Sequence, residues 1–201
     1  MSIFQQTLHA LAGILDRQAE IGQEAVERCI RLSAEAVRED HRIFVCGNGG
    51  SAATASHIAN DLLCHMKNWN RKNYRVMALT DNMSVITSIS NDYGFDQIFS
   101  KQIQAYGEPG DVLWSFSTSG NSPNCAVAAE QARRQGVITV GFTGKKGGKL
   151  KEICDIWIPV DSDEVTRVEE LHLIYAHMIG EQIEASVSPM QVEGRQNGTV
   201  F

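Results

Sequence analysis

The chain lacks most of the features that mark a specialised class of protein. Its five cysteines are widely spaced and form no Cys-x-x-Cys pair, which favours reduced thiols in a cytoplasmic protein over a disulfide framework. The net charge of −6 argues against nucleic acid or an anionic membrane as the main partner. No apolar run is long enough to cross a bilayer, and the first residues lack the pattern of a signal peptide. The 201 residues, 43% of them hydrophobic, suffice for one globular domain with a full core.

Short β-rich runs alternate with helical stretches from residue 43 onward. The predicted strands are 43–46, 75–79, 112–116, 137–142 and 156–160, and the predicted helices are 52–66, 95–106, 122–135, about 146–153 and 164–185. This alternation predicts right-handed βαβ crossovers and an α/β fold. We expect a three-layer sandwich in which a five-stranded, mostly parallel sheet carries helices on both faces.

Residues 3–37 are predicted to be helical throughout, and no strand precedes them. They form an N-terminal helical arm, for which packing against a partner subunit and covering the sheet are equally open. We expect a single domain over 1–201. It consists of the arm (1–37), an α/β core with a C-terminal helix (38–185) and a polar tail (186–201) that is either disordered or wraps a neighbour.

Two loops at the predicted strand ends are suited to binding an anion. Gly47-Asn48-Gly49-Gly50-Ser51 follows the first strand, and its glycines let the backbone turn tightly in front of a helix whose first N–H groups are free. Ser51 is placed as the N-cap of that helix. The third strand ends in a hydroxyl-rich loop, 117–122, just before Pro123. Because ligands bind outside the carboxyl ends of parallel strands, both loops predict a phosphate site.

Two helices carry side chains suited to a metal or to proton transfer. His57 and Asp61 are four residues apart and share a helix face, and Glu169 and His177 are two turns apart on another helix. Two imidazoles and two carboxylates suit zinc, and equally manganese or another divalent ion. The plainer alternative is a packing or capping histidine in an i,i+4 pair, with Glu169 in a solvated first turn. His172 has no candidate partner at a helical spacing and is expected to be either partly exposed or packed in the core.

Gly47, Gly49 and Ala52 also match a G-x-G-x-x-A dinucleotide fingerprint. That site requires an acid about 20 residues beyond the glycines, at the end of the second strand. Asp81 stands too far along the chain, so a dinucleotide is the weaker alternative.

Five motifs together resemble the SIS (sugar isomerase) domain family, specifically the phosphoheptose isomerase type, up to about residue 185. They are CGNGGSA at 46–52, NDYGF at 91–95, STSGNS at 117–122, GFTG-x-x-GG at 141–148 and RVEELH-x4-H at 167–177. The resemblance implies a flavodoxin-like sandwich, a homotetramer with active sites at subunit interfaces, and one divalent metal, zinc, per subunit. It also implies conversion of sedoheptulose 7-phosphate to D-glycero-D-manno-heptose 7-phosphate, a step in the synthesis of heptose for bacterial lipopolysaccharide.

The same resemblance assigns residues to roles. The implied metal ligands are His57, Asp61, Glu169 and His177. The implied substrate contacts are Asp61, Glu169, Asn48, Gly49, Gly50, Ser51, Asn91, Asp92, Ser117, Thr118, Ser119 and Ser122, with the serines gripping the phosphate. Relatives usually carry glutamate at position 61 and glutamine at 169, so this chain has one shortened acid and one additional negative charge.

Moving a carbonyl between neighbouring carbons through an enediolate requires a base, a proton donor and an electropositive group. We hypothesise that Asp61 and His177 share the proton transfers while the metal polarises the oxygens. Two alternatives remain open. One is a non-catalytic SIS protein, either a sugar-phosphate sensor or a replication-initiation adaptor, although relatives of the adaptor type have lost the acid and the last histidine that this chain keeps. The other is an isomerase of a different sugar phosphate.

Overall fold

The computed structural model describes residues 1–18, 20–64, 66–68 and 71–187. At its centre lies a five-stranded sheet in the order β2-β1-β3-β4-β5. The strands are β1 (Arg42–Gly47), β2 (Arg75–Ala78), β3 (Val112–Ser117), β4 (Ile138–Gly144) and β5 (Ile156–Val160). All four pairings are parallel. The five predicted strands are confirmed, and their order is that of the flavodoxin-like fold, with its switch point between β1 and β3.

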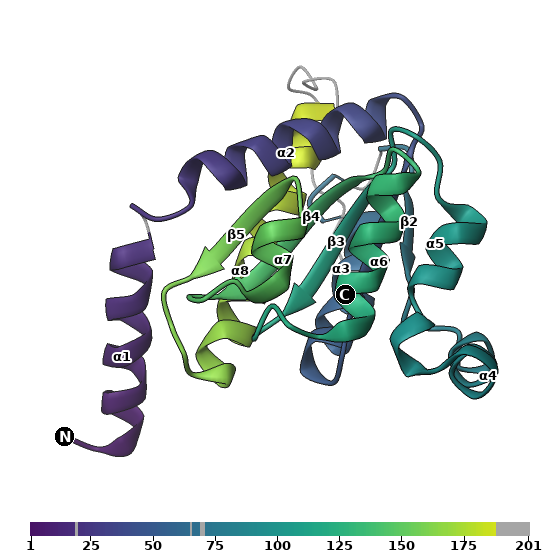
Figure 1. The fold of residues 1–201 in the computed structure, drawn as a ribbon. Helices are drawn as coiled ribbons and strands as arrows, with labels where there is room; N and C mark the ends of the chain where they lie inside the picture. Colours follow the sequence, from purple (N-terminus) through teal and green to yellow (C-terminus); the bar gives the residue numbers. More distant parts are fainter. Residues whose placement is uncertain (19, 65, 69–70, 188–201) are drawn as a thin grey trace, which may run out of the picture.

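Helices cover both faces of this sheet (Figure 1). One face carries α2 (Gln23–Arg38), α3 (Gly50–Cys64) and α8 (Val165–Val187), and the other carries α5 (Ser100–Tyr106), α6 (Pro123–Arg134) and α7 (Gly148–Ile153). Successive residues of a strand point to opposite faces, so Ile43 and Trp114 enter the first core whereas Phe44 and Leu113 enter the second. Every residue of β3 is buried, as a strand covered on both sides requires.

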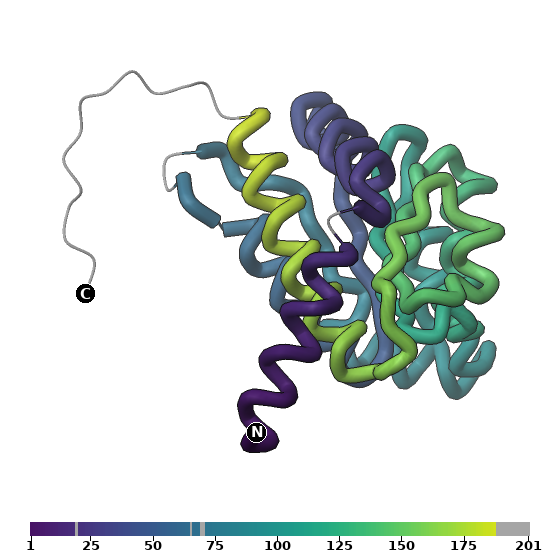
Figure 2. Tube along the Cα trace, turned by 90° about the vertical axis from the view of Figure 1, so that its left-hand side faces the viewer, coloured from purple at the N-terminus to yellow at the C-terminus, as the bar shows by residue number. Residues whose placement is uncertain are grey.

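The N-terminal residues form two helices instead of one continuous arm. α1 (Ile3–Gln18) is separated from α2 by a turn containing Gly22, whose φ of 85° lies in the left-handed region. α2 packs against the sheet and α8, so it belongs to the sandwich. α1 stands away from the sheet (Figures 1 and 2), with Phe4 and Leu8 exposed and Ile14 buried near its end. The predicted helical arm is therefore confirmed as two helices, of which α2 covers the sheet, one of the two uses that the sequence left open.

Helix α4 (Met83–Tyr93) was not predicted, because its serine, threonine and β-branched residues have weak helix propensity. It is capped at its start by Asn82, whose side chain accepts a hydrogen bond from Val85 N at 3.2 Å, and it ends at Gly94. The predicted helix 95–106 divides into a 3-10 turn, η1 (Phe95–Gln97), and α5. The other predicted helices are confirmed with ends shifted by a few residues. Tail residues 188–201 lie outside the described part of the chain, in which no helix is long and apolar enough to span a membrane.

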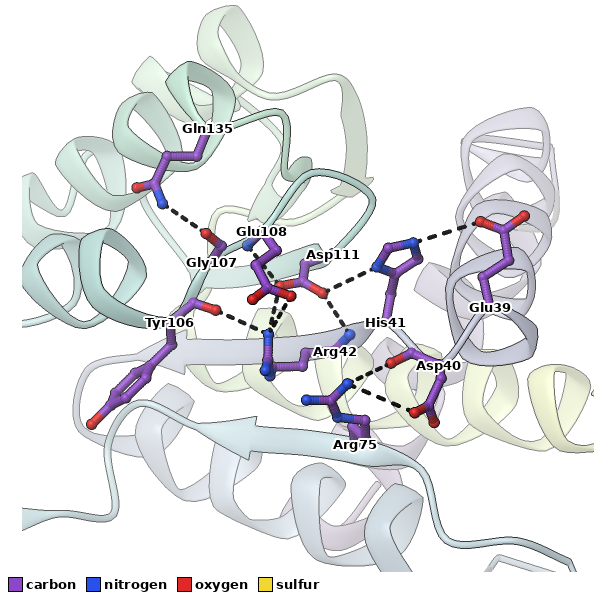
Figure 3. A network of polar contacts seen from close by, with 10 residues as sticks. All are labelled: Glu39, Asp40, His41, Arg42, Arg75, Tyr106, Gly107, Glu108, Asp111 and Gln135. Carbon is purple, nitrogen blue, oxygen red and sulfur yellow. Dashed lines mark hydrogen bonds and ion pairs between the residues drawn. The ribbon is translucent and has the colours of Figure 1, made fainter.

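A buried polar network joins the amino ends of β1 and β3 (Figure 3). Asp111 is fully buried, and its two carboxylate oxygens accept hydrogen bonds from Arg42 N at 2.7 Å and Glu108 N at 2.9 Å. The side chains of His41 and Arg42 each lie 3.6 Å from the same carboxylate. This network fixes the starts of the two central strands. It lies at the amino ends of the strands, opposite to the carboxyl ends where ligands of this fold bind.

Candidate active site

Side chains from two helices that are distant in sequence converge on one point. His57 and Asp61 lie one turn apart on α3, and His177 projects from α8. His57 Nε2 is 2.9 Å from His177 Nε2, and Asp61 Oδ2 is 3.3 Å from each of these nitrogens. We call these three residues the triad.

The dimensions of the triad fit a small divalent ion. Ligands bound at about 2.0–2.1 Å in a tetrahedral arrangement are separated by about 3.3 Å, close to the three observed distances. The side chains of His57, His177 and Asp61 are 50%, 37% and 23% exposed, so one side of the triad is open. A metal held there would keep a position free for a further ligand, which is characteristic of catalytic and not of structural centres.

The fourth expected ligand, Glu169, lies apart from the triad. Its carboxylate sits against Gly50, the first residue of α3, where an added Cβ would be only 2.5 Å from Glu169 Oε1. Among the described residues, the group of possible metal ligands comprises the triad alone. The N-terminus of α3 is electropositive and favours a carboxylate beside it. Glu169 therefore faces the glycine loop, whereas His57 stands two turns further along α3.

The glycine loop is tied to helix α6 across the switch point. Asn48 Nδ2 donates to Asn124 Oδ1 at 2.9 Å, and Asn124 Nδ2 donates to Asn48 Oδ1 at 2.7 Å. Asn124 is buried in the first turn of α6. It was missed by sequence reasoning, because an asparagine after Ser-Pro is typical of a turn and does not by itself indicate a binding site. Ser51 lies inside the first turn of α3, which begins one residue earlier, so its predicted N-cap position is wrong.

The hydroxyl-rich loop after β3 is held in shape by its own contacts. Ser117 Oγ lies 2.9 Å from Ser122 Oγ, and Ser122 is the N-cap residue of α6. Gly144 N donates to Thr118 O at 2.9 Å. Gly120 has a φ of 66°, and a Cβ there would fall 1.9 Å from the carbonyl oxygen of Gly147. The loop after β3 thus depends on close approach to the loop after β4.

These two loops border a pocket of about 250 Å³. Thr118 and Ser119 line it from one side, and Lys145 and Lys146 from the other. Lys145 Nζ pairs with Asp161 at 3.0 Å, whereas Lys146 is 83% exposed and lies 3.6 Å from Asp163. Hydroxyls, backbone N–H groups and ammonium groups at a helix N-terminus suit an anionic phosphate.

Two of the expected substrate contacts lie elsewhere. Asn91 and Asp92 are in the last turn of α4, and both are exposed. Asn91 Nδ2 donates to Asp92 Oδ1 at 2.8 Å. In the described part of the chain, no hydrogen bond or ion pair connects them with the triad or with either loop.

A further histidine of α8 packs in the core, the second of the two positions that the sequence left open. His172 is 1% exposed and packs against Phe116 and Phe142, with ring centroids 5.6 and 6.2 Å apart. Burial lowers the pKa of His172 to about 4, an effect only partly offset by the nearby Thr143 backbone. The imidazole is therefore uncharged at neutral pH.

The arrangement defines a flavodoxin-like α/β protein whose candidate metal group lies between two helices, on a fold that places anion-binding loops at its switch point. A family model for the SIS domain matches residues 7–144, and the chain belongs to the SIS domain family. A phosphoheptose isomerase of Akkermansia muciniphila is 38% identical over 179 residues, which is 88% of this chain and 94% of that protein. The predicted resemblance is confirmed.

Solved structures agree with this assignment. A phosphoheptose isomerase from Neisseria gonorrhoeae matches with a TM-score of 0.82 and 32% identity, covering 90% of this chain and 99% of that one. One from Francisella tularensis matches with a TM-score of 0.87 and 29% identity, covering 90% and 96% of the two chains.

Proposed function

We propose that the chain converts sedoheptulose 7-phosphate to D-glycero-D-manno-heptose 7-phosphate, for the heptose of bacterial lipopolysaccharide. Its kinship with phosphoheptose isomerases over most of its length makes it an aldose–ketose isomerase. The observation that carries the proposal is the triad, which the sequence separates by up to 120 residues and the fold brings within 3.3 Å. The proposed unit is one domain, working in the cytoplasm, where its cysteines would stay reduced.

The reaction takes a proton from C1 of the ketose, delivers one to C2, and moves a hydroxyl proton from O1 to O2. Asp61 and His177 are proposed to share the proton transfers. Their Oδ2 and Nε2 atoms, 3.3 Å apart, would also hold the divalent ion, so the carboxylate oxygen of Asp61 that the ion leaves free would take up a proton, and His177 would transfer one only while its Nε2 is not bound to the ion. His57, Asp61 and His177 would hold one divalent ion, which we propose to be zinc and which would polarise the substrate oxygens. The serines of the hydroxyl-rich loop would hold the phosphate, with the sugar carbons extending past Asn48 and Gly50.

Glu169 is proposed to contact the substrate or to join the metal ligands from its place over Gly50. With two carboxylates near one ion, the positive charge offered to the substrate would be weaker than in a site with a single carboxylate. This arrangement also keeps open an isomerase of another sugar phosphate as the second candidate function.

The test is turnover of a panel of ketose and aldose phosphates, with the metal-free and the metal-loaded chain. We expect turnover of the seven-carbon ketose phosphate only by the loaded chain. Turnover of a different sugar phosphate would move the assignment to the second candidate. Tight binding without any turnover would contradict the isomerase and favour a sensor.

We also propose a homotetramer, and an exposed apolar surface supports it. Ile3, Phe4 and Leu8 of α1 are 78%, 69% and 50% exposed. An apolar groove of about 430 Å³ between α1, α2 and α8 is lined by residues that include Ile174 and Met178, next to His177. A second copy seated there would border the triad, as expected for active sites shared between subunits. Sedimentation of the double variant Phe4→Asp/Leu8→Asp tests this: a smaller species is expected, and an unchanged mass would contradict it.

A further inference from the structure

A buried ion pair joins the chain segment after α3 to the end of α8. Arg71 Nε donates to Glu184 Oε1 at 2.6 Å, and both side chains are 3% exposed. Glu184 also accepts hydrogen bonds from the backbone N–H groups of Met66, Lys67 and Asn68, at 3.1, 2.6 and 3.0 Å. Four donors thus surround one carboxylate, and the segment after α3 is fastened to α8.

The same arginine also binds the C-terminal end of α3. Arg71 Nη2 donates to the carbonyl oxygen of Leu62 at 2.7 Å and to that of Asp61 at 3.3 Å. These carbonyls belong to the last turn of the helix, where backbone oxygens have no partner within it. The guanidinium is held in place by the ring of Tyr74, whose centroid lies 3.7 Å away. The planar guanidinium group of Arg71 therefore contacts both the backbone of Asp61 on α3 and the carboxylate of Glu184 on α8.

This contact controls a distance that a metal would need. Asp61 and His57 come from α3, whereas His177 comes from α8, two turns before Glu184 on the same face and about 10 Å from it along the axis. The spacing between the two helices sets the distance between the ligands. Metal sites tolerate errors of only about 0.2 Å in their bond lengths. A shift of about 1 Å between the helices would therefore prevent the three triad side chains from binding one ion together.

We propose that Arg71 and Glu184 are positioning residues for the metal, holding α3 and α8 at the spacing that the triad requires. This inference rests on the proposed function only in so far as the triad binds a divalent ion. A stabilising role alone would be a weak explanation, because buried ion pairs are often replaced by apolar residues without loss of stability.

The experiment compares metal affinity with stability in the same variants. The metal-free full-length chain is titrated with Zn²⁺ in competition with a chromophoric chelator, and its thermal unfolding is followed without metal. Arg71→Met is expected to weaken Zn²⁺ binding about 10- to 100-fold, the usual effect of removing a partner that orients a ligand. Arg71→Lys keeps the charge but cannot reach every acceptor, and it is expected to lose less affinity while folding more readily.

The double variant Arg71→Met/Glu184→Gln separates the two roles. It removes both buried charges and keeps an amide oxygen as an acceptor for the backbone N–H groups, so thermal stability should recover relative to Arg71→Met, whereas Zn²⁺ affinity should stay low because the Asp61 carbonyl is no longer held. Asp111→Asn is the matched control: it alters a buried carboxylate whose partners are Arg42, His41 and the Glu108 backbone, and it is expected to lower stability with Zn²⁺ affinity unchanged.

Unchanged Zn²⁺ affinity in Arg71→Lys and in the double variant would overturn the proposal. So would an affinity loss in Asp111→Asn as large as that in Arg71→Met, because affinity would then simply follow stability. If the wild-type chain bound no divalent ion, the metal centre and its positioning would both be wrong. Normal metal binding without sugar-phosphate turnover would instead contradict only the proposed reaction.

Discussion

The network around Asp111 and the triad use polar side chains in opposite ways. At the amino ends of β1 and β3, Asp111 is fully buried and surrounded by Arg42, His41 and the Glu108 backbone (Figure 3). On the outer side of α3 and α8, His57 is half exposed, and in the described part of the chain its polar contacts are with the other members of the triad. A buried charge must have all its partners inside the protein, whereas a ligand site leaves some of its bonding capacity free. The first network serves the fold, and the second is arranged to bind.

The largest expected effect would come from the triad. His177→Ala should slow the turnover of sugar phosphate by about 100- to 10,000-fold, the range for losing a group that transfers protons. Thermal stability should change little, because the side chain is 37% exposed. Steady-state kinetics with the metal-loaded variant measure this, and full activity would remove His177 from the chemistry.

Asp111→Asn should show the reverse pattern. Removing one charge from a buried network costs about 3–5 kcal/mol in the free energy of unfolding, which urea denaturation would measure. The remaining folded fraction should keep its turnover rate at low temperature, because the partners of Asp111 are Arg42, His41 and the Glu108 backbone and include no member of the triad. Slower turnover without a loss of stability would contradict the assignment of the Asp111 network to the fold and of the triad to binding.

His172 provides a test of pH dependence on the side of the core next to the site. Its pKa is about 4 in the folded chain and about 6.5 when unfolded, so the unfolded state binds a proton first as the pH falls. The contribution is fully present above about pH 6.5 and is lost as the pH falls toward 4, and it amounts to about 3 kcal/mol. His172→Leu should remove this slope from the stability-versus-pH curve. An identical slope in the variant would contradict the assignment.

The smallest effect is expected at Glu169. Glu169→Gln removes one negative charge from the glycine-loop end and should speed turnover by less than about 10-fold, since a metal facing one carboxylate keeps more of its charge for the substrate. The matching stability change should be small, because the side chain is only partly buried. Steady-state kinetics of the metal-loaded variant measure the effect, and markedly slower turnover would show that the acid itself is needed.

Most of the fold could be predicted from hydrophobic patterning. Apolar runs of four to six residues bounded by glycine and polar loops predicted the five strands, because a fully covered parallel sheet requires such runs. Helix α4 was missed since its serine, threonine and β-branched residues have weak helix propensity. Its two end signals, Asn82 and Gly94, were present in the sequence and would have revealed it.

The candidate site was only partly predictable. Residues four apart on one helix, His57 and Asp61, follow from helix geometry alone. That His177 meets them depends on how α8 packs against α3, and no local pattern specifies this. Glu169 was expected with them from its spacing on α8 and from the resemblance, yet it reaches Gly50 instead. The contacts of Arg71 and Asn124 depend on three-dimensional packing and have no local signal.

The position of α8 in the chain has a consequence for biosynthesis. This helix is made after all five strands, and it supplies the second imidazole of the triad. A growing chain on the ribosome therefore cannot assemble the binding centre until its last helix has emerged and docked. Binding of an ion would then follow the docking of α8, and it would not direct the earlier steps of folding.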